Sequence, residues 1–258
     1  MYSGAITSTL DVAQAVLYMF WAFFAGLIYY LHRENKREGY PLESDTGMGR
    51  NRYEGFPATP DPKTFTLANG EVWMAPGPNS APQALEGGEF TSRLPGAPIV
   101  PIGNPMLAGV GPGSYAKRAD VPDMTFEGGL RIVPLRDAPD YEVDHHDPDP
   151  RGMQVLGADG KVGGTVVDLW VDRSEAIFRY IELEVEAPAG KRRVMLPMNF
   201  ARVNRRFVKA RSILADHFAD VPGLRQDGRI TRLEEEKVMA YYGAGTLYAT
   251  PGRQEPLL

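Results

Sequence analysis

Residues 11–37 read DVAQAVLYMFWAFFAGLIYYLHRENKR, and this stretch decides how the chain is organised. No charged residue occurs from Val12 to Leu31, and Gln14 is the only strongly polar side chain there. About 20 apolar residues in a helix are needed to cross a hydrocarbon core roughly 30 Å thick. The stretch therefore predicts a transmembrane helix, which we place at residues 12–32.

A signal peptide and a buried core helix are the alternatives for this stretch. A signal peptide needs a basic region before the apolar one and small residues at a cleavage site. No Lys or Arg precedes Asp11, and the run LIYYL at 27–31 is bulky. A core helix usually keeps a polar stripe, which is almost absent here. The sequence favours the membrane span over both.

Basic residues flank the predicted span on one side only. Arg33, Lys36 and Arg37 follow it, and no basic residue precedes it. The positive-inside rule then predicts that residues 1–11 lie outside and that the rest of the chain is cytoplasmic. The same three residues are candidates for binding anionic lipid headgroups, where each such charge contributes about 1 kcal/mol.

The composition of the chain excludes several classes of protein. Cysteine is absent, so the chain has no disulfide framework and no thiolate metal site. The formal net charge of −5 argues against a nucleic-acid-binding surface. No P-loop, dinucleotide fingerprint or nucleophile–base pair is apparent, and the chain is not expected to be an enzyme on its own.

Residues 33–115 are rich in Pro and Gly, as in APGPNSAPQ (75–83) and LPGAPIVPIGNPM (94–106). This density predicts an extended cytoplasmic segment that lies on another surface. Residues 64–67 and 71–74 are expected to form a small hairpin around the turn ANG. Disorder is the alternative, but aromatic residues such as Phe65 and Trp73 argue against it.

Short strands are predicted from about residue 130 onward. The stretches RIVPL, MQVLGADGKVGGTVVDLWVD, FRYIELEVEA, KRRVMLPMNFARVN and RFVKARSI are β-branched, partly alternating and separated by turns. Residues 180–186 alternate strictly between apolar and acidic, which predicts an antiparallel strand with one solvated face. Such closely spaced strands indicate a small barrel or sandwich.

A helix is predicted near the end of the chain, in TRLEEEKVMAYYGAGTLYA (231–249). Thr231 and Glu234 have the spacing of a capping box. Gly243 or Gly245 is expected to end the helix, because glycine commonly follows a helix C-terminus.

An ordered set of motifs resembles one known family along essentially the whole chain. The motifs are GLIYYL (26–31), REGYPLE (37–43), PKTF (62–65), GNPM (103–106), GVGP (109–112), DPRG (149–152), GTVVDLWVDRSE (164–175), RYIELEVE (179–186), LEEEKV (233–238) and AYYGAGTLYATP (240–251). Together they are similar to the H subunits of the photosynthetic reaction centres of purple bacteria. No single motif is decisive, but their order is specific.

The resemblance implies a fold. It is a single N-terminal transmembrane α-helix followed by a mainly β cytoplasmic domain, a small antiparallel barrel of the PRC-barrel kind, with a C-terminal helix. The expected layout is a periplasmic N-terminus (1–11), the membrane helix (12–32), the extended segment (33–115) and the globular domain (116–258). The barrel core is expected at about 130–230.

The resemblance also implies partners. The family's H subunit caps the cytoplasmic face of the L and M subunits in the intracytoplasmic, or chromatophore, membrane and helps to deliver protons to the secondary quinone. Bacteriochlorophyll, bacteriopheophytin, ubiquinone or menaquinone, and a non-haem iron are carried by the complex and not ligated by this chain. A cytochrome subunit and a light-harvesting ring are further partners that the resemblance allows. It also places Tyr40 at the interface near the quinone region.

Candidate proton-transfer residues lie in VDLWVDRSEAIFRYIE (167–182). By resemblance, Asp172, Glu175 and Arg179 line the proton route, and Glu175 is expected to be the most sensitive. A carboxylate in a partly dry interface has a raised pKa and can exchange protons near neutral pH. The alternative is structural: Asp172 as a helix cap, with Glu175 and Arg179 as an i,i+4 ion pair.

The chain departs from the resemblance in VPDMTFEGGLRIVP (121–134), which contains no His. Some family members have an Asp and two His before the barrel that form the proton entry. Asp123 and Glu127 are the carboxylates available here, so protons are expected to enter through them or through the partner subunits. A surface metal site that blocks the entry is not expected.

The stretch YEVDHHDPDPRG (141–152) contains metal-ligand residue types, including the adjacent His145 and His146. We expect these two side chains to point apart, and a closed zinc site needs four converging ligands. The sequence therefore favours an acidic surface loop without a metal.

Two other classes of function remain as alternatives. A membrane-anchored PRC-barrel adaptor for RNA processing or cytoskeletal work would be favoured by a basic patch, whereas the overall charge is acidic. A hydrolase tethered by the span would need a catalytic constellation, and none is apparent.

Overall fold

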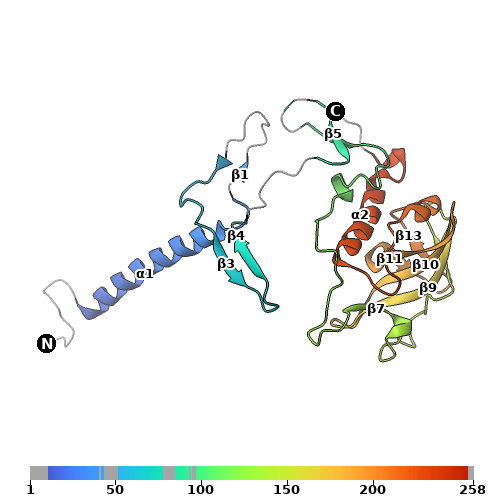
Figure 1. Ribbon diagram of the computed structural model, residues 1–258, viewed down its shortest axis with the longest axis horizontal. Helices are drawn as coiled ribbons and strands as arrows, with labels where there is room; N and C mark the ends of the chain where they lie inside the picture. Colours follow the sequence, from blue (N-terminus) through green and yellow to red (C-terminus); the bar gives the residue numbers. More distant parts are fainter. Residues whose placement is uncertain are drawn as a thin grey trace. The chain divides into compact units, whose positions relative to one another are not determined.

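The computed structural model describes residues 11–40, 42–43, 52–77, 85–92, 94 and 97–254 (Figure 1). The predicted periplasmic N-terminus, apart from Asp11, lies outside the described residues. The chain divides into two compact units, one formed by residues 1–84 with 93–97 and the other by residues 85–92 with 98–258.

Helix α1 (Val12–Asn35) opens the first unit. Asp11 caps it: its carboxylate accepts from the backbone N–H of Gln14 at 2.8 Å, while the Gln14 side chain accepts from the N–H of Asp11 at 3.3 Å. The polar residue in the apolar run therefore completes a capping box. No residue of α1 is buried, and by length and composition the helix can cross a membrane. A buried core helix does not fit these observations.

Two small antiparallel pairs follow in the first unit. They are β1 (Leu42–Glu43) with β2 (Arg52–Tyr53), and β3 (Lys63–Thr66) with β4 (Val72–Ala75). The second pair is the hairpin that the sequence predicts, displaced by one residue in each strand. Phe65 lies opposite Trp73, and both side chains are exposed in this chain.

The second unit contains the remaining strands and helices. The strands are β5 (Gly88–Phe90), β6 (Ile99–Pro101), β7 (Ile132–Pro134), β8 (Gln154–Leu156), β9 (Val162–Asp172), β10 (Ile177–Ala187), β11 (Gly190–Pro197), β12 (Ala201–Val203) and β13 (Phe207–Ala210). Helix α2 spans Arg232–Tyr248, and the 3₁₀ turns are η1 (Gly111–Gly113), η2 (Leu135–Asp137), η3 (Met198–Phe200), η4 (Ala215–Asp220) and η5 (Pro251–Arg253).

Seven of these strands form one open, barrel-like sheet (Figure 1). Their order is β11-β10-β9-β8-β13-β12, and β7 pairs with the end of β9. All pairs are antiparallel except β8 with β13, which is parallel. The predicted mainly β domain with a C-terminal helix is therefore confirmed, with one parallel pair that a purely antiparallel barrel would not contain. A separate pair, β5 with β6, lies outside this sheet.

Strand β10 differs from the prediction of one solvated face. Tyr180 and Glu182 are buried as deeply as Ile181 and Leu183 on the opposite face. The strand is therefore buried on both faces from Tyr180 to Leu183, whereas Ile177 at its start and Glu186 near its end are exposed. Glu182 can be buried because its carboxylate accepts hydrogen bonds from two arginines and a tryptophan, as described below.

Helix α2 packs against β11 and places Val238, Tyr241 and Tyr242 in the core (Figure 1). The predicted capping box is present, because Thr231 Oγ1 accepts from the N–H of Glu234 at 3.1 Å and Glu234 accepts from the N–H of Thr231 at 2.8 Å.

The prediction that a glycine ends α2 is wrong, because the helix continues through Gly243 and Gly245 to Tyr248. A Cβ at Gly243 would lie 2.6 Å from the carbonyl oxygen of Pro112, and one at Gly245 would lie 2.6 Å from that of Ser212. These two glycines therefore allow the backbone of Pro112 and Ser212 to pack closely against the helix, and they do not end it.

Part of the stretch predicted to be extended packs with the globular unit. Gly88 lies against Val110, and Gly113 lies against Ala244 of α2, each so closely that a Cβ would meet the neighbour at 2.9 Å. Residues 85–92 and 98–115 accordingly belong to the second unit.

Candidate functional site

An ion cluster forms around Arg131 at the end of the sheet. Arg131 immediately precedes β7, whose first residue, Ile132, is paired with Asp172 at the end of β9. This pairing brings a guanidinium and a carboxylate together although they are far apart in sequence. Sequence patterns alone do not identify Arg131, because only the β7–β9 pairing brings it beside Asp172.

Arg131 contacts three carboxylates. Its Nε lies 3.0 Å from both carboxylate oxygens of Asp172, and its other nitrogens contact Glu175 at 2.6 Å and Asp123 at 3.3 Å. Arg179 adds a second cation, 3.2 Å from Asp172 and 3.6 Å from Glu175. We call Asp123, Arg131, Asp172, Glu175 and Arg179 the Arg131 cluster.

Asp172 is the fixed centre of the Arg131 cluster. Its side chain is 0% exposed, and the backbone N–H groups of Ser174 and Glu175 donate to it at 3.0 and 3.2 Å. Burial alone would raise the pKa of Asp172, but hydrogen bonds from Arg131, Arg179 and these amides outweigh it, so the pKa is lowered. The raised pKa that we expected for such a carboxylate is not found at Asp172, which stays ionised.

The helical alternative for these residues is also wrong. Residues 173–176 form the turn of the β9–β10 hairpin, and the N–H of Ala176 donates to the carbonyl of Asp172 at 2.8 Å. Asp172 therefore organises a hairpin turn rather than a helix start. Glu175 and Arg179 still pair, but Glu175 lies in the turn and Arg179 lies on the following strand, β10.

Glu175 and Asp123 are the accessible carboxylates of the Arg131 cluster. The Glu175 side chain is 48% exposed and that of Asp123 is 37% exposed, whereas Asp172 is closed to solvent. The predicted residue Glu127 is not part of the cluster. It lies in the exposed turn between Thr125 and Gly129, without an ion pair in the described part of the chain.

A further acid–phenol pair, Glu235 and Tyr180, lies near the Arg131 cluster. The hydroxyl of Tyr180 donates to Glu235 at 2.8 Å. Burial raises the pKa of Glu235; Tyr180 and Arg179 oppose that rise, and Asp123 adds to it. In the sequence, Glu235 is one of three successive glutamates in the first turn of the predicted helix. Its position on α2 beside β10 depends on tertiary packing, and no local signal could have revealed it.

Exposed apolar side chains flank the Arg131 cluster. Phe126 is fully exposed, and Val121, Met124 and Ile177 are each about half exposed. They lie on the same two segments as Asp123 and Glu175. Large exposed apolar side chains beside an ion cluster are typical of a surface that another protein covers.

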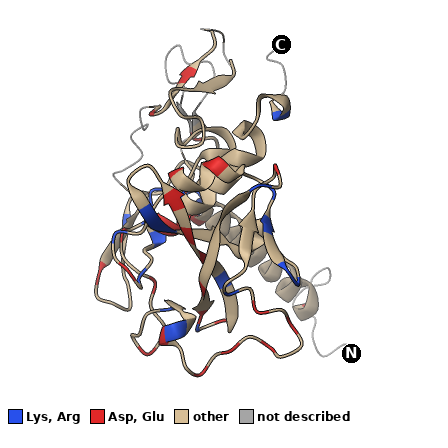
Figure 2. Cartoon of the chain, turned by 90° about the vertical axis from the view of Figure 1, so that its right-hand side faces the viewer, with Lys and Arg blue, Asp and Glu red and all other residues tan. Residues whose placement is uncertain are grey.

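A second arginine cluster lies deeper in the same sheet. Arg136, in η2 just after β7, contacts Glu182 at 2.6 Å and Asp168 at 3.1 Å. Glu182 also accepts from Trp170 Nε1 at 3.1 Å and from Arg193 at 2.9 Å. We call these five residues the Arg136 cluster. In Figure 2 both charge types occur along the strands of the sheet.

The predicted lipid-binding residues after α1 have different environments. Lys36 is buried, donates to the carbonyls of Glu54 and Pro57, and lies 5.0 Å from the ring centre of Tyr40. It therefore stabilises the first unit and does not fit the headgroup role. Arg33 is exposed and keeps that role as a prediction.

Arg37 is likewise engaged within the first unit. It pairs with Glu34 at 2.8 Å and donates to the carbonyls of Asp61 and Ala75 at 2.7 and 3.2 Å. Its side chain is mostly buried, so it holds the hairpin segment to the end of α1.

The exposed loop after Tyr141 brings metal-ligand residue types together. The rings of His145 and His146 lie with their centres 3.8 Å apart, so the expectation that they point apart is wrong. Donor atoms of Asp144, His145 and His146 lie within 4.8 Å of one another, and all three residues are exposed. The loop remains acidic and solvated, and the absence of a metal stays a prediction.

The comparison with protein families agrees with this architecture. Residues 4–137 match the N-terminal region of the photosynthetic reaction centre H chain, which is more than half of the 258 residues. Residues 142–220, which contain strands β8–β13, match the PRC-barrel domain. The chain therefore belongs to the family of photosynthetic reaction centre H chains.

Proposed function

We propose that this chain is the cytoplasmic cap of a purple-bacterial reaction centre and that its Arg131 cluster forms part of the proton route to the secondary quinone. Membership of the H-chain family supports the first part, because such chains are reaction centre subunits. The second part rests on one observation: the guanidinium of Arg131 contacts one buried, ionised aspartate and two accessible carboxylates.

The anchoring arrangement follows from α1 and the charges after it. The apolar helix crosses the membrane with its N-terminus in the periplasm, because basic residues follow it and none precedes it. The β-rich domain then lies on the cytoplasmic face of the L and M subunits, which carry the pigments, the quinones and the non-haem iron.

The exposed apolar residues beside the Arg131 cluster support this docking. Covering Phe126, Met124 and Ile177 removes apolar surface from water, which favours association. The same contact would place Asp123 and Glu175 at the interface with the partner subunits. In the proposed complex both carboxylates therefore lie beside the subunits that carry the quinones.

The carboxylates around Arg131 have different roles in this proposal. Asp172 keeps its charge and positions Arg131 and Arg179. Glu175 accepts and releases the proton, because its side chain is accessible and contacts both Arg131 and Arg179. Glu235, whose pKa burial raises, is a second exchange group next to Arg179.

The Glu175→Gln variant of the assembled complex tests the proton route. The step to measure is the proton-coupled second reduction of the secondary quinone, followed by absorbance after two flashes. We expect it to slow roughly tenfold. The effect is smaller than the 10²–10⁴ of a group that transfers a proton directly to substrate, because Asp123 and Glu235 remain.

The matched control is Glu186→Gln, which removes an exposed carboxylate from the far end of β10. It should leave the second reduction unchanged. Equal rates in wild type and Glu175→Gln, or equal slowing in both variants, would contradict the assigned route. Failure of the tagged chain to co-purify with reversibly bleaching bacteriochlorin pigment would contradict the cap itself.

A further inference from the structure

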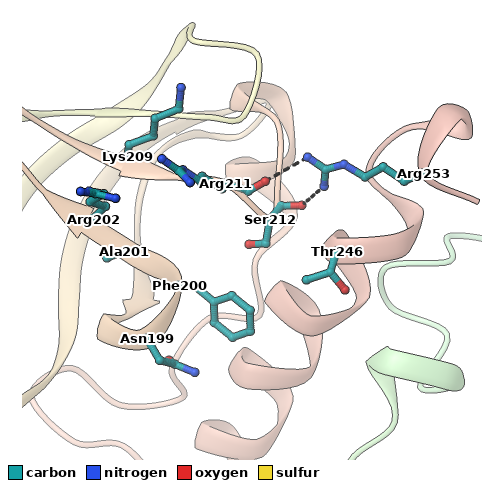
Figure 3. A pocket seen from close by; sticks show the side chains of 9 residues that line it. All are labelled: Asn199, Phe200, Ala201, Arg202, Lys209, Arg211, Ser212, Thr246 and Arg253. Atoms are coloured by element: carbon teal, nitrogen blue, oxygen red, sulfur yellow. Dashed lines mark hydrogen bonds between the residues drawn. The ribbon is translucent and has the colours of Figure 1, made fainter.

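A basic cavity of about 360 Å³ lies between the β12–β13 pair and the C-terminal end of α2 (Figure 3). Four cationic side chains are among the residues that line it: Arg202, Lys209, Arg211 and Arg253. From Ala187 to Ala215 the chain contains eight basic residues and no Asp or Glu. The local charge is therefore opposite to the net charge of −5 of the whole chain.

In the part of the chain that the structure describes, the cations of this cavity lack acidic partners. Arg202 and Lys209 are directly opposite each other in the antiparallel β12–β13 pair, where like charges destabilise the pairing. Within residues 97–254, all of which the structure describes, none of the four cations forms an ion pair with a carboxylate. An anion between them would relieve this repulsion.

Arg253 closes the other side of the cavity. Its guanidinium donates to the carbonyls of Arg211 at 2.9 Å and Ser212 at 2.6 Å, drawn as dashed lines in Figure 3, and to that of Gly245. These bonds fix its position and offset the negative end of α2, which would otherwise repel an anion.

The hydroxyl of Ser212 gives independent support for a ligand in this cavity. Ser212 is 6% exposed, and its Oγ has no hydrogen-bond partner in the structure. It lines the cavity, and Figure 3 shows it between the arginines at positions 211 and 253. Buried hydroxyls are nearly always hydrogen-bonded, so an unpartnered one indicates a missing acceptor.

We propose that this cavity binds a phosphate group, with Ser212 Oγ as a hydrogen-bond donor and Lys209, Arg211 and Arg202 supplying charge. Phosphate oxygens are acceptors only, which matches a lining of donors, and arginine is well suited to them. The phosphate can come from a free phosphorylated compound or from the headgroup of an anionic lipid. Neither the family assignment nor the proposed proton route requires this site.

Isothermal titration of the full chain in detergent with inorganic phosphate tests the proposal. Saturable binding is expected for the wild type. Lys209→Gln should weaken it roughly tenfold, as for loss of one hydrogen bond to a charged group. The control Lys161→Gln removes one exposed positive charge outside the cavity and should leave the affinity unchanged.

A second measurement uses the absence of cysteine from the chain. The Thr246→Cys variant carries a single thiol at an exposed position of the cavity lining, and phosphate should slow its modification by a small methanethiosulfonate reagent. This readout reports on the cavity itself and requires only that the variant folds, which circular dichroism checks.

Two further experiments distinguish a lipid headgroup from a free phosphorylated compound as the source of the phosphate. Vesicles containing phosphatidylglycerol should protect the thiol of Thr246→Cys more than phosphatidylcholine vesicles if the ligand is a lipid headgroup. Protection by soluble phosphate with no difference between the vesicles assigns a free ligand. Absence of saturable phosphate binding, or equal weakening by Lys209→Gln and Lys161→Gln, would overturn the site.

Discussion

The Arg131 cluster and the Arg136 cluster are built from the same kinds of residue on the same strands, but they differ in exposure. Arg131 and Arg136 flank β7, and each contacts an aspartate of β9. In the Arg136 cluster, Asp168 is 5% exposed and Glu182 is 2% exposed. In the Arg131 cluster, only Asp172 is closed, and Glu175 and Asp123 reach solvent.

This difference separates a structural network from the site to which we assign proton exchange as a proposal. A buried carboxylate with several fixed donors cannot change its charge without losing those bonds. An accessible carboxylate beside a cation can gain or release a proton while its neighbours stay in place. Changes to the two clusters should therefore affect stability and proton transfer differently.

The largest expected effect is on stability, from Glu182→Ala in the Arg136 cluster. The change leaves Arg136, Arg193 and the Trp170 N–H without their shared acceptor. Removing one partner of a buried ion pair typically costs about 3–5 kcal/mol. Equilibrium chemical denaturation of the full chain in detergent, followed by tryptophan fluorescence, measures the free energy of unfolding.

Glu186→Ala is the control for that variant, because Glu186 is exposed at the end of the same strand. Its free energy of unfolding should stay within about 0.5 kcal/mol of the wild type. If both variants lost the same free energy of unfolding, burial of a β10 carboxylate would not determine its contribution to stability.

A smaller loss, about 2 kcal/mol, is expected from Asp172→Asn, because Arg131 and Arg179 remain partly hydrated. The pH dependence gives the sharper test. The pKa of Asp172 is lowered below its ordinary value of 3.8, so its stabilisation is present above that pH and is lost as the pH falls below it. The variant should lose less stability than the wild type between about pH 4 and pH 2. Parallel acid profiles for the two proteins would show that Asp172 is not held ionised.

The smallest effect, about 1 kcal/mol or less, is expected from Glu235→Gln. Burial raises the pKa of Glu235 above 4.5, so the folded chain binds the proton more tightly than the unfolded chain. The contribution of this group to stability therefore falls as the pH rises from 4.5 through the folded pKa. Glu235→Gln should abolish this decline, and Glu236→Gln should retain it. A decline that persists in Glu235→Gln would assign it to another group.

Local patterns were sufficient to predict the apolar helix α1, the Phe65–Trp73 hairpin, the strands of the sheet and the cap of α2. Each of these depends on residues that are close in sequence, such as Thr231 with Glu234. The continuation of α2 past Gly243 could not be predicted, because it depends on the backbone of Pro112.

The candidate site was only partly predictable for the same reason. Asp172, Glu175 and Arg179 lie in one hairpin, and a resemblance to a family identified them. Arg131 joins them only through the pairing of β7 with β9. The burial of Lys36 and Glu182 was missed because it requires acceptors or donors from distant segments, namely residues 54–57 for Lys36 and Arg136 for Glu182.

The parallel pairing of β8 with β13 has a consequence for the order in which the domain folds. Strands β9, β10 and β11 are joined by short turns, so their contacts are local and can form early. The β8–β13 pair must enclose the entire chain from β9 to β12, and closing so long a loop is slow. During synthesis β8 emerges well before β13, and the sheet is complete only when β13 has left the ribosome. We therefore expect the antiparallel unit of β9, β10 and β11 to form first and the last strands to be added to it.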